Sequence, residues 1–147
     1  MATAENHLIE LLPRKERRRL LAICERIELV RGEVLGDRGN ATRNVYFPTE
    51  GFISLVTPLD GKPVLEVGLV GREGMWGSHL ALGVVTEPLH PLVQGSGAAW
   101  RLGNRNFAGI QLCAALRRQR RPQAMDEHAF VAILRQLHEN GIGIQSN

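Results

Sequence analysis

Apolar residues at helical spacing open the chain. They fall on one side of a stretch from residue 5 to 12 and recur among arginines from 14 to 25, with Pro13 between the two stretches. This spacing predicts two short helices, because residues three and four apart share a helix face. We therefore expect residues 1–26 to form an N-terminal helical segment.

After residue 26 the pattern changes to short apolar runs separated by glycines. The β-rich runs are residues 27–29, 34–35, 44–47, 52–56, 64–70, 92–94 and 98–102. Short strands between turn residues are typical of antiparallel sandwiches and barrels. Asp60-Gly61 lies between two runs and predicts a hairpin turn. The sequence thus predicts a mainly β fold with flanking helices, in which an antiparallel β-roll or jelly-roll occupies residues 27–103.

Helical spacing returns in three places after the first strands. Residues 75–82 fit one or two turns of helix that interrupt the β-rich region. Apolar residues from 104 to 121 predict a longer helix, which Pro122 ends, and a last helix is predicted over 126–139. We therefore expect residues 104–147 to form a C-terminal helical segment.

Composition narrows the class of protein. The 147 residues are 44% hydrophobic, enough for the core of one domain. No apolar run approaches the roughly 20 residues of a membrane span, and the N-terminus lacks the basic start of a signal peptide. Cys24 and Cys113 are too few and too distant for a disulfide framework or a metal cluster. We expect a cytoplasmic protein with no membrane association and no metal site.

Charge is unevenly distributed along the chain. The net charge is +3, but residues 14–26 carry a local +4 and residues 103–121 a local +5, mostly from arginines between 117 and 121. Residues 27–102 carry −2. The second basic segment is either a solvated helix face or helix end or a surface that contacts phosphates, and the sequence leaves both interpretations open.

Motifs for catalysis are absent from the sequence. The glycines between 74 and 83 form neither a GxGxxG nor a Walker loop, the five histidines form no HExxH, and no serine lies in a GxSxG elbow. We therefore predict that the protein is not an enzyme.

Three stretches of sequence, taken with the order of the elements, resemble the effector-sensing domain of the Crp/Fnr transcriptional regulators. The stretches are RGEVL at 31–35, NVYFPTEGFISLV at 44–56 and EVGLVGREGM at 66–75. The resemblance covers about residues 5–121. It implies a cyclic-nucleotide-binding-like β-roll that cups a small-molecule effector under the short helix and the loop before it.

The resemblance also implies which residues contact the effector. They are Gly74, Met75, Gly77, Ser78, His79 and His90. Structural roles compete with this assignment. Ser78 and His79 are otherwise turn and helix-surface residues, Met75 and Trp76 are core or pocket wall, and His90 is a loop or strand-start residue.

Two departures from the family pattern bear on the effector. Cyclic-nucleotide binders of the family carry Gly-Glu, whose carboxylate accepts the ribose hydroxyl, whereas Gly77 is followed by Ser78. They also carry an Arg that pairs with the cyclic phosphate, and His90 stands nearest that position. Losing both charged partners removes several kcal/mol, at roughly 1.5–3 kcal/mol for each charged bond. No cofactor is certain. We expect a small anionic or nucleotide effector, if any, and no tight binding of cAMP.

Family members pair through the helix that follows the roll and usually continue into a DNA-binding domain. The resemblance therefore implies a homodimer through Phe107, Ile110 and Leu116, unless the helix at 126–139 folds back over these residues. Residues 122–147 are too short for a winged helix-turn-helix. We expect DNA contact only indirectly, or through a domain absent from this chain, although the arginines at 117–121 leave direct nucleic-acid binding as a weaker alternative.

Two functions from different classes follow. The first is an effector-sensing regulatory module with a degenerate cAMP site, which acts in ligand-controlled transcription regulation. The alternative is a protein-interaction or dimerisation module that retains a vestigial ligand pocket.

Overall fold

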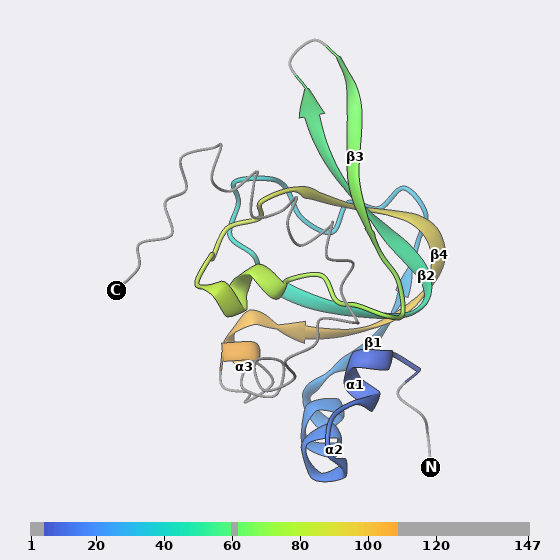
Figure 1. The fold of residues 1–147 in the computed structure, drawn as a ribbon, viewed down its shortest axis with the longest axis vertical. Coiled ribbons are helices and arrows are strands. Elements are labelled where there is room, and N and C mark those ends of the chain that lie inside the picture. Colours follow the sequence, from blue (N-terminus) through green and yellow to red (C-terminus); the bar gives the residue numbers. More distant parts are fainter. Residues whose placement is uncertain (1–4, 60–61, 109–147) are drawn as a thin grey trace.

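The fold is an antiparallel β-roll with helices at one end (Figure 1). The computed structural model describes residues 5–59 and 62–108. The predicted fold class, mainly β with flanking helices, is confirmed. A long hairpin extends from the roll on the side away from the N-terminal helices.

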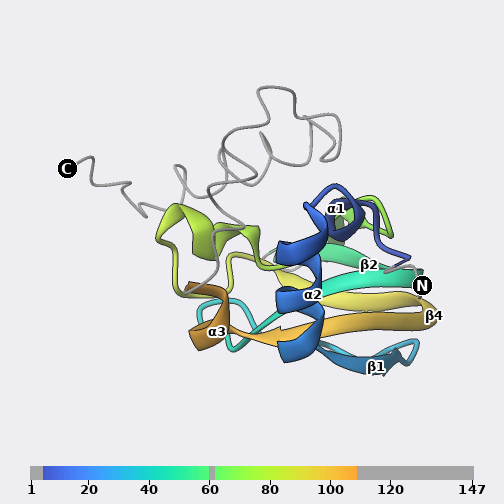
Figure 2. The ribbon, with the colours of Figure 1, turned by 90° about the horizontal axis from the view of Figure 1, so that it is seen from below.

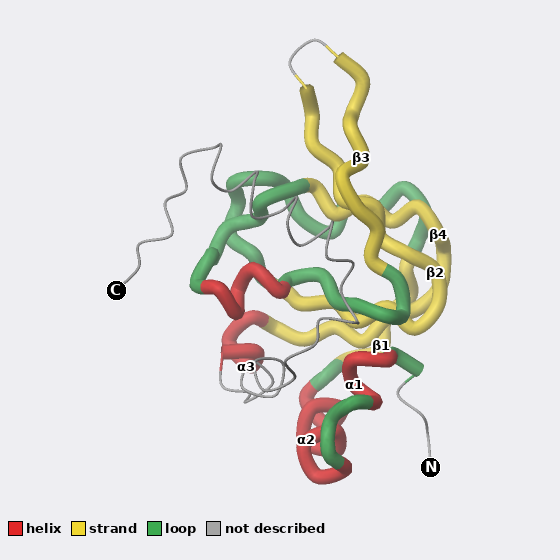
Figure 3. Tube along the Cα trace, in the orientation of Figure 1, coloured by secondary structure: helices red, strands yellow, loops and turns green. Residues whose placement is uncertain are grey.

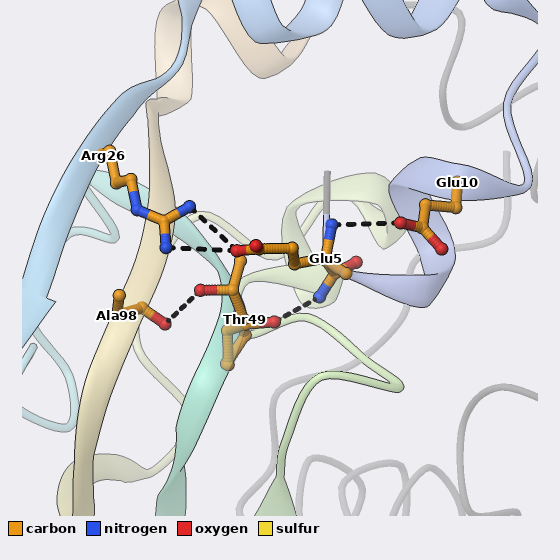
Figure 4. A network of polar contacts seen from close by, with 7 residues as sticks. Glu5, Glu10, Arg26, Thr49 and Ala98 are labelled. Atoms are coloured by element: carbon orange, nitrogen blue, oxygen red, sulfur yellow. Dashed lines mark hydrogen bonds and ion pairs between the residues drawn. The ribbon is translucent and has the colours of Figure 1, made fainter. Parts of the chain in front are cut away.

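Two short helices begin the described chain. They are α1, His7–Glu10, and α2, Arg14–Ile23, and they confirm the predicted pair with slightly shorter ends. Asn6 caps α1, because its side chain accepts hydrogen bonds from the amides of Leu8 and Ile9 at 3.1 and 3.3 Å. Beside this cap, the Arg26 guanidinium pairs with the Glu5 carboxylate at 3.1 Å (Figure 4).

Four antiparallel strands form a single sheet. They are β1 Glu25–Leu29, β2 Asn44–Leu59, β3 Lys62–Val70 and β4 His90–Gly103, in the order β1-β4-β2-β3 (Figure 3). β2 and β4 are long enough to curl, so one sheet wraps into a roll. The β2–β3 pairing ends at Leu59 opposite Lys62, which confirms the hairpin predicted at residues 60–61, although these two residues lie outside the described part.

Several predicted strand boundaries were wrong. The runs at 44–47 and 52–56 belong to one strand, β2, and the runs at 92–94 and 98–102 belong to β4. Gly51 marks a bulge rather than a turn: its φ is +74°, and a Cβ there would lie 2.2 Å from the Gly95 carbonyl oxygen. Residues 34–35 form no strand, and Val34 makes only an isolated bridge to Leu92.

Two further elements complete the described part. A 3-10 helix, η1, spans Ser78–Leu82 within the predicted helical stretch 75–82, and α3 spans Asn104–Ala108 at the start of the predicted C-terminal helix. Figure 2 shows α2 in front of the sheet, between α1 and α3. The rest of the predicted helix to residue 121, and the helix at 126–139, lie outside the described residues.

The core consists of two clusters on the sheet. The first joins α1, α2, β2 and α3, with Leu8, Ile9, Leu12, Leu20, Val45, Phe47, Met75, Leu102 and Phe107. The second fills the roll, with Leu29, Tyr46, Ile53, Leu55, Val70, Trp76, Leu89, Val93 and Ala99. Met75 and Trp76 are adjacent in sequence but belong to different clusters, so the segment that carries them is fixed between the two.

Candidate functional site

Residues 71–83, called the cassette below, follow β3 and include η1. The cassette opens with a turn in which the Gly74 amide donates to the Gly71 carbonyl at 3.1 Å and the Glu73 carboxylate accepts from the Gly71 amide at 2.9 Å. Trp76 then pairs with Tyr46 of β2 through two backbone hydrogen bonds, of 2.9 and 3.0 Å. The start of η1 is therefore anchored to the sheet.

Glycines bound η1 on both sides. Gly77 precedes it with φ +106° and Gly83 follows it with φ +84°, a backbone region that side chains disfavour. A Cβ on Gly77 would lie 2.9 Å from Cγ2 of Val45, whereas a Cβ on Gly83 would meet nothing within 4 Å. Gly77 thus lets the cassette approach β2 closely, and Gly83 only turns the chain.

The cassette residues that the sequence singled out lie at different depths. Gly74, Met75 and Gly77 are buried, and Ser78 is half-buried. Met75 and Trp76 belong to the core, as the structural interpretation predicted. His79 is only 2% exposed, so it is not a helix-surface residue.

A buried polar cluster surrounds His79. Its Nε2 lies 2.7 Å from the Thr42 hydroxyl, and its ring packs at a tilt against Trp76, with ring centroids 5.2 Å apart. The Trp76 indole donates to the carboxyl group of Glu87 at 3.1 Å, and Glu87 also hydrogen-bonds the Thr42 side chain. The cluster therefore joins the cassette, which carries Trp76 and His79, to the two loops that carry Thr42 and Glu87.

Burial changes the ionisation of both titratable members of this cluster. Desolvation lowers the pKa of His79 to about 4, so its imidazole is neutral at pH 7. Desolvation also raises the pKa of Glu87 to about 7, although the hydrogen bonds from Trp76 and Thr42 oppose the rise. Glu87 is thus the group in the cluster whose charge changes near neutral pH.

Two loops pair beside the cassette and hold Glu87 in place. The Glu87 amide donates to the Asn40 carbonyl at 2.8 Å, and its carbonyl accepts from the Gly39 amide at 2.9 Å. The Thr42 amide donates to the Val85 carbonyl at 2.9 Å. The loop before β2 is therefore joined to the loop between η1 and β4 by backbone hydrogen bonds.

His90, the first residue of β4, lies at the end of these paired loops. Its Nδ1 accepts a hydrogen bond from the Arg38 amide at 3.3 Å and lies 3.7 Å from the Asp37 carboxylate. The Arg38 guanidinium reaches back to the Thr57 hydroxyl of β2 at 3.5 Å. His90 therefore holds the backbone of Arg38, and the guanidinium lies over a buried residue of the sheet.

Comparisons with known proteins identify the fold. No protein-family model matches the chain, and no curated protein matches its sequence. The regulatory subunit of a cAMP-independent protein kinase A from Trypanosoma brucei, a mutant bound to cAMP in its A site, matches with a TM-score of 0.72 at 14% identity. That match covers 95% of this chain and 48% of the other.

Two further solved structures have a similar fold. The regulatory subunit of a cAMP-independent protein kinase A from Trypanosoma cruzi, bound to guanosine, gives a TM-score of 0.70 at 15% identity, over 95% of this chain and 47% of the other. The Thermus thermophilus catabolite activator protein gives 0.58 at 19% identity, over 92% and 60%. This chain spans about half the length of the two kinase subunits.

The chain has a cyclic-nucleotide-binding-like fold. The resemblance to Crp/Fnr effector domains is thereby confirmed at the level of the fold. Within this cyclic-nucleotide-binding-like domain, Ser78 stands after Gly77, and the described cassette residues include no acid between Gly74 and Gly83. The departures noted in the sequence thus lie in the cassette itself and at the first residue of β4.

Sequence reasoning missed Thr42, Glu87 and Arg38. All three lie in loops. The periodicity of apolar residues identifies the buried face of a helix or strand, but it cannot predict which loop residues are buried. Their roles depend on the pairing of two loops that are over 40 residues apart in the chain. The sequence signal that could have pointed to Glu87 is its place directly before Pro88 and Leu89, two apolar residues.

The predicted dimerisation residues are only partly described. Phe107 is 2% exposed and packs into the first core cluster within a single chain, so little of its side chain remains for a partner to bury. Ile110 and Leu116 lie outside the described residues. The homodimer stays a prediction that depends on these two residues.

The described residues offer neither a metal-binding cluster nor a membrane-spanning helix. Among residues 5–59 and 62–108, no group of three or more His, Cys, Asp or Glu side chains is placed to hold a metal ion. Helices in that same part of the chain are too short and too polar to cross a membrane.

Proposed function

We propose that the chain is an effector-sensing regulatory domain that acts in ligand-controlled transcription regulation rather than in catalysis. The observation that carries the proposal is the cassette: a short helix between two left-handed glycines, anchored to β2, on a cyclic-nucleotide-binding-like fold. The match to the Thermus thermophilus catabolite activator protein supports a role in transcription.

The proposed effector is a nucleoside, a nucleotide or another small anion, and cAMP binds weakly. His79 is buried and neutral, so it cannot replace a charged partner for the cyclic phosphate. Ser78 is half-buried and offers a hydroxyl, whose bonds are weaker than those of a carboxylate. The trypanosomal subunit that holds guanosine, which has no phosphate, supports a ligand other than a cyclic nucleotide.

Thermal denaturation with a ligand panel tests the proposal. The panel is guanosine, adenosine, AMP, cGMP, cAMP and inorganic phosphate, each at 1 mM. A ligand at a hundred times its Kd adds about 2.7 kcal/mol to the free energy of unfolding, so we expect one member to raise Tm by several degrees, with no shift for cAMP. Ser78→Trp, which places a large side chain at the first residue of η1, should abolish the shift, whereas Gln94→Trp on the exposed side of β4 should not. A panel without any shift would contradict effector sensing.

One observation favours the second candidate, an interaction or dimerisation module with a vestigial pocket. Met75, Trp76 and His79 are sealed in the core, which leaves little of the cassette open to a ligand. This candidate predicts a homodimer at tens of micromolar that Leu116→Asp dissociates and that no panel member stabilises. Sedimentation velocity of the two proteins, with and without each ligand, separates the candidates.

A further inference from the structure

The guanidinium of Arg38, a half-buried side chain, makes few hydrogen bonds to the described residues. Its backbone amide is held by His90 Nδ1 at 3.3 Å, and its guanidinium makes one long hydrogen bond, 3.5 Å, to the Thr57 hydroxyl. Ordinary N–H···O bonds are about 2.7–3.2 Å long. An arginine carries five N–H donors, so most of its donors have no acceptor in the described part of the chain.

The side chains of Arg38 and Thr57 offer donors rather than acceptors. Thr57 is only 2% exposed, and its hydroxyl accepts from Arg38 while its own hydrogen has no acceptor among the described residues. A hydroxyl and a guanidinium therefore face each other with unused donors. The partner that complements this arrangement is an atom with several lone pairs, such as an oxyanion oxygen.

Nearby carboxylates do not fill this place. The Asp37 side chain is largely exposed and lies 3.7 Å from His90 Nδ1. Glu66 accepts a hydrogen bond from Ser54. Among residues 5–59 and 62–108, no carboxylate lies within ion-pair distance of Arg38. A cation over a buried hydroxyl, with no ion-pair partner in this part of the chain, is a favourable setting for a small anion.

We infer that the Arg38 guanidinium and the Thr57 hydroxyl form an oxyanion site that takes the phosphate group of the effector. This inference rests on the proposed function, because it names the charged end of that effector. His90 stands where cyclic-nucleotide binders are expected to carry Arg. It acts as a positioning residue, since its Nδ1 holds the Arg38 amide. The cation then comes from the loop before β2 instead of from β4.

Titration with inorganic phosphate tests the site. The amide resonances of Arg38 and Thr57 are followed by NMR at constant ionic strength. Loss of one charge-assisted bond of about 1.5–3 kcal/mol weakens binding by about 10- to 100-fold, so Arg38→Gln should raise the Kd at least tenfold. Arg43→Gln, an exposed arginine in the same loop, should leave it within about twofold. Arg38→Lys should recover part of the affinity, which shows that the effect is not a loss of folding.

Further measurements compare phosphate with a carboxylate, and they distinguish failure of the oxyanion site from failure of the proposed function. Acetate in place of phosphate asks whether a carboxylate also binds, and we expect a weaker response. Phosphate that binds the wild type and Arg38→Gln equally, or that does not bind at all, overturns the oxyanion site. If guanosine still raises Tm in that case, the proposed function stands. If phosphate binding depends on Arg38 but no nucleoside or nucleotide binds, the site stands and the proposed function fails.

Discussion

Glu87 can occupy two hydrogen-bonded states because Thr42 has a single hydroxyl proton. When Glu87 is ionised, Thr42 donates to it and accepts from the Nε2–H of His79. When Glu87 is protonated, it can donate to Thr42, and Thr42 then donates to an unprotonated Nε2. Protonation of Glu87 is therefore compatible with a change in the tautomer of His79, a cassette residue, that adds no charge to its ring.

This chemistry predicts a pH-dependent stability with a definite sign. The Glu87 pKa rises from 4.5 unfolded to about 7 folded, so the folded state binds its proton more tightly. Its contribution to the free energy of unfolding is therefore fully present below pH 4.5 and is lost as pH rises through 7. Each pKa unit is worth about 1.4 kcal/mol, so the loss is on the order of 2 kcal/mol after solvent screening. Glu87→Gln cannot ionise and should escape this loss.

Urea unfolding at pH 5 and pH 8 measures the effect. The free energy of unfolding of Glu87→Gln, minus that of the wild type, should increase by about 2 kcal/mol between the two pH values. Glu28→Gln, an exposed glutamate of β1, is the matched control for the loss of one negative charge. His79 has the opposite dependence, because its pKa falls from 6.5 to about 4 and its contribution is lost as pH falls through that range. An equal difference at both pH values would show that Glu87 is not the titrating group.

At the scale of elements, the cassette depends on its two bounding glycines. Both have positive φ, but only Gly77 lies against β2. Gly83→Ala should cost about 1 kcal/mol, from the left-handed backbone alone. Gly77→Ala should cost about 1–3 kcal/mol more, because its Cβ would lie 2.9 Å from Val45 Cγ2. Denaturant midpoints of both variants measure the difference, and equal costs would mean that the close approach to Val45 contributes nothing.

The same elements show what sequence could predict and why the rest was out of reach. Apolar runs between glycines predicted the β-rich region, Asp60-Gly61 predicted the hairpin, and helical spacing predicted both N-terminal helices, because those patterns record local geometry. The sequence could not predict that β2 continues through Gly51, because a glycine in a bulge and a glycine in a turn look alike in sequence. The hydrogen bonds of Glu87 and Arg38 could not be predicted either, because they form only when loops distant in sequence pair.

On the scale of the whole molecule, Asn6 joins three parts of the fold. It is fully buried, and its carboxamide oxygen caps α1 while its nitrogen donates to the carbonyls of Pro48 in β2 and Gly74 in the cassette, at 2.8 and 2.9 Å. Both the oxygen and the nitrogen of its carboxamide are thus engaged. The helices, the sheet and the cassette also share the first core cluster, so a change at Asn6 acts on all of them.

Asn6→Ala should therefore destabilise the whole domain in one transition. It removes a helix cap worth about 1 kcal/mol and two cross-links of about 1 kcal/mol each, and it leaves two buried carbonyls without these donors, for a total of about 3 kcal/mol. Far-UV circular dichroism reports the helices, and the fluorescence of Trp76 and Trp100 reports the roll. We expect both signals to fall at the same, lower urea midpoint. Asn40→Ala, in an exposed loop, should shift neither. Loss of the helical signal before the fluorescence change would show instead that α1 and α2 unfold separately from the roll.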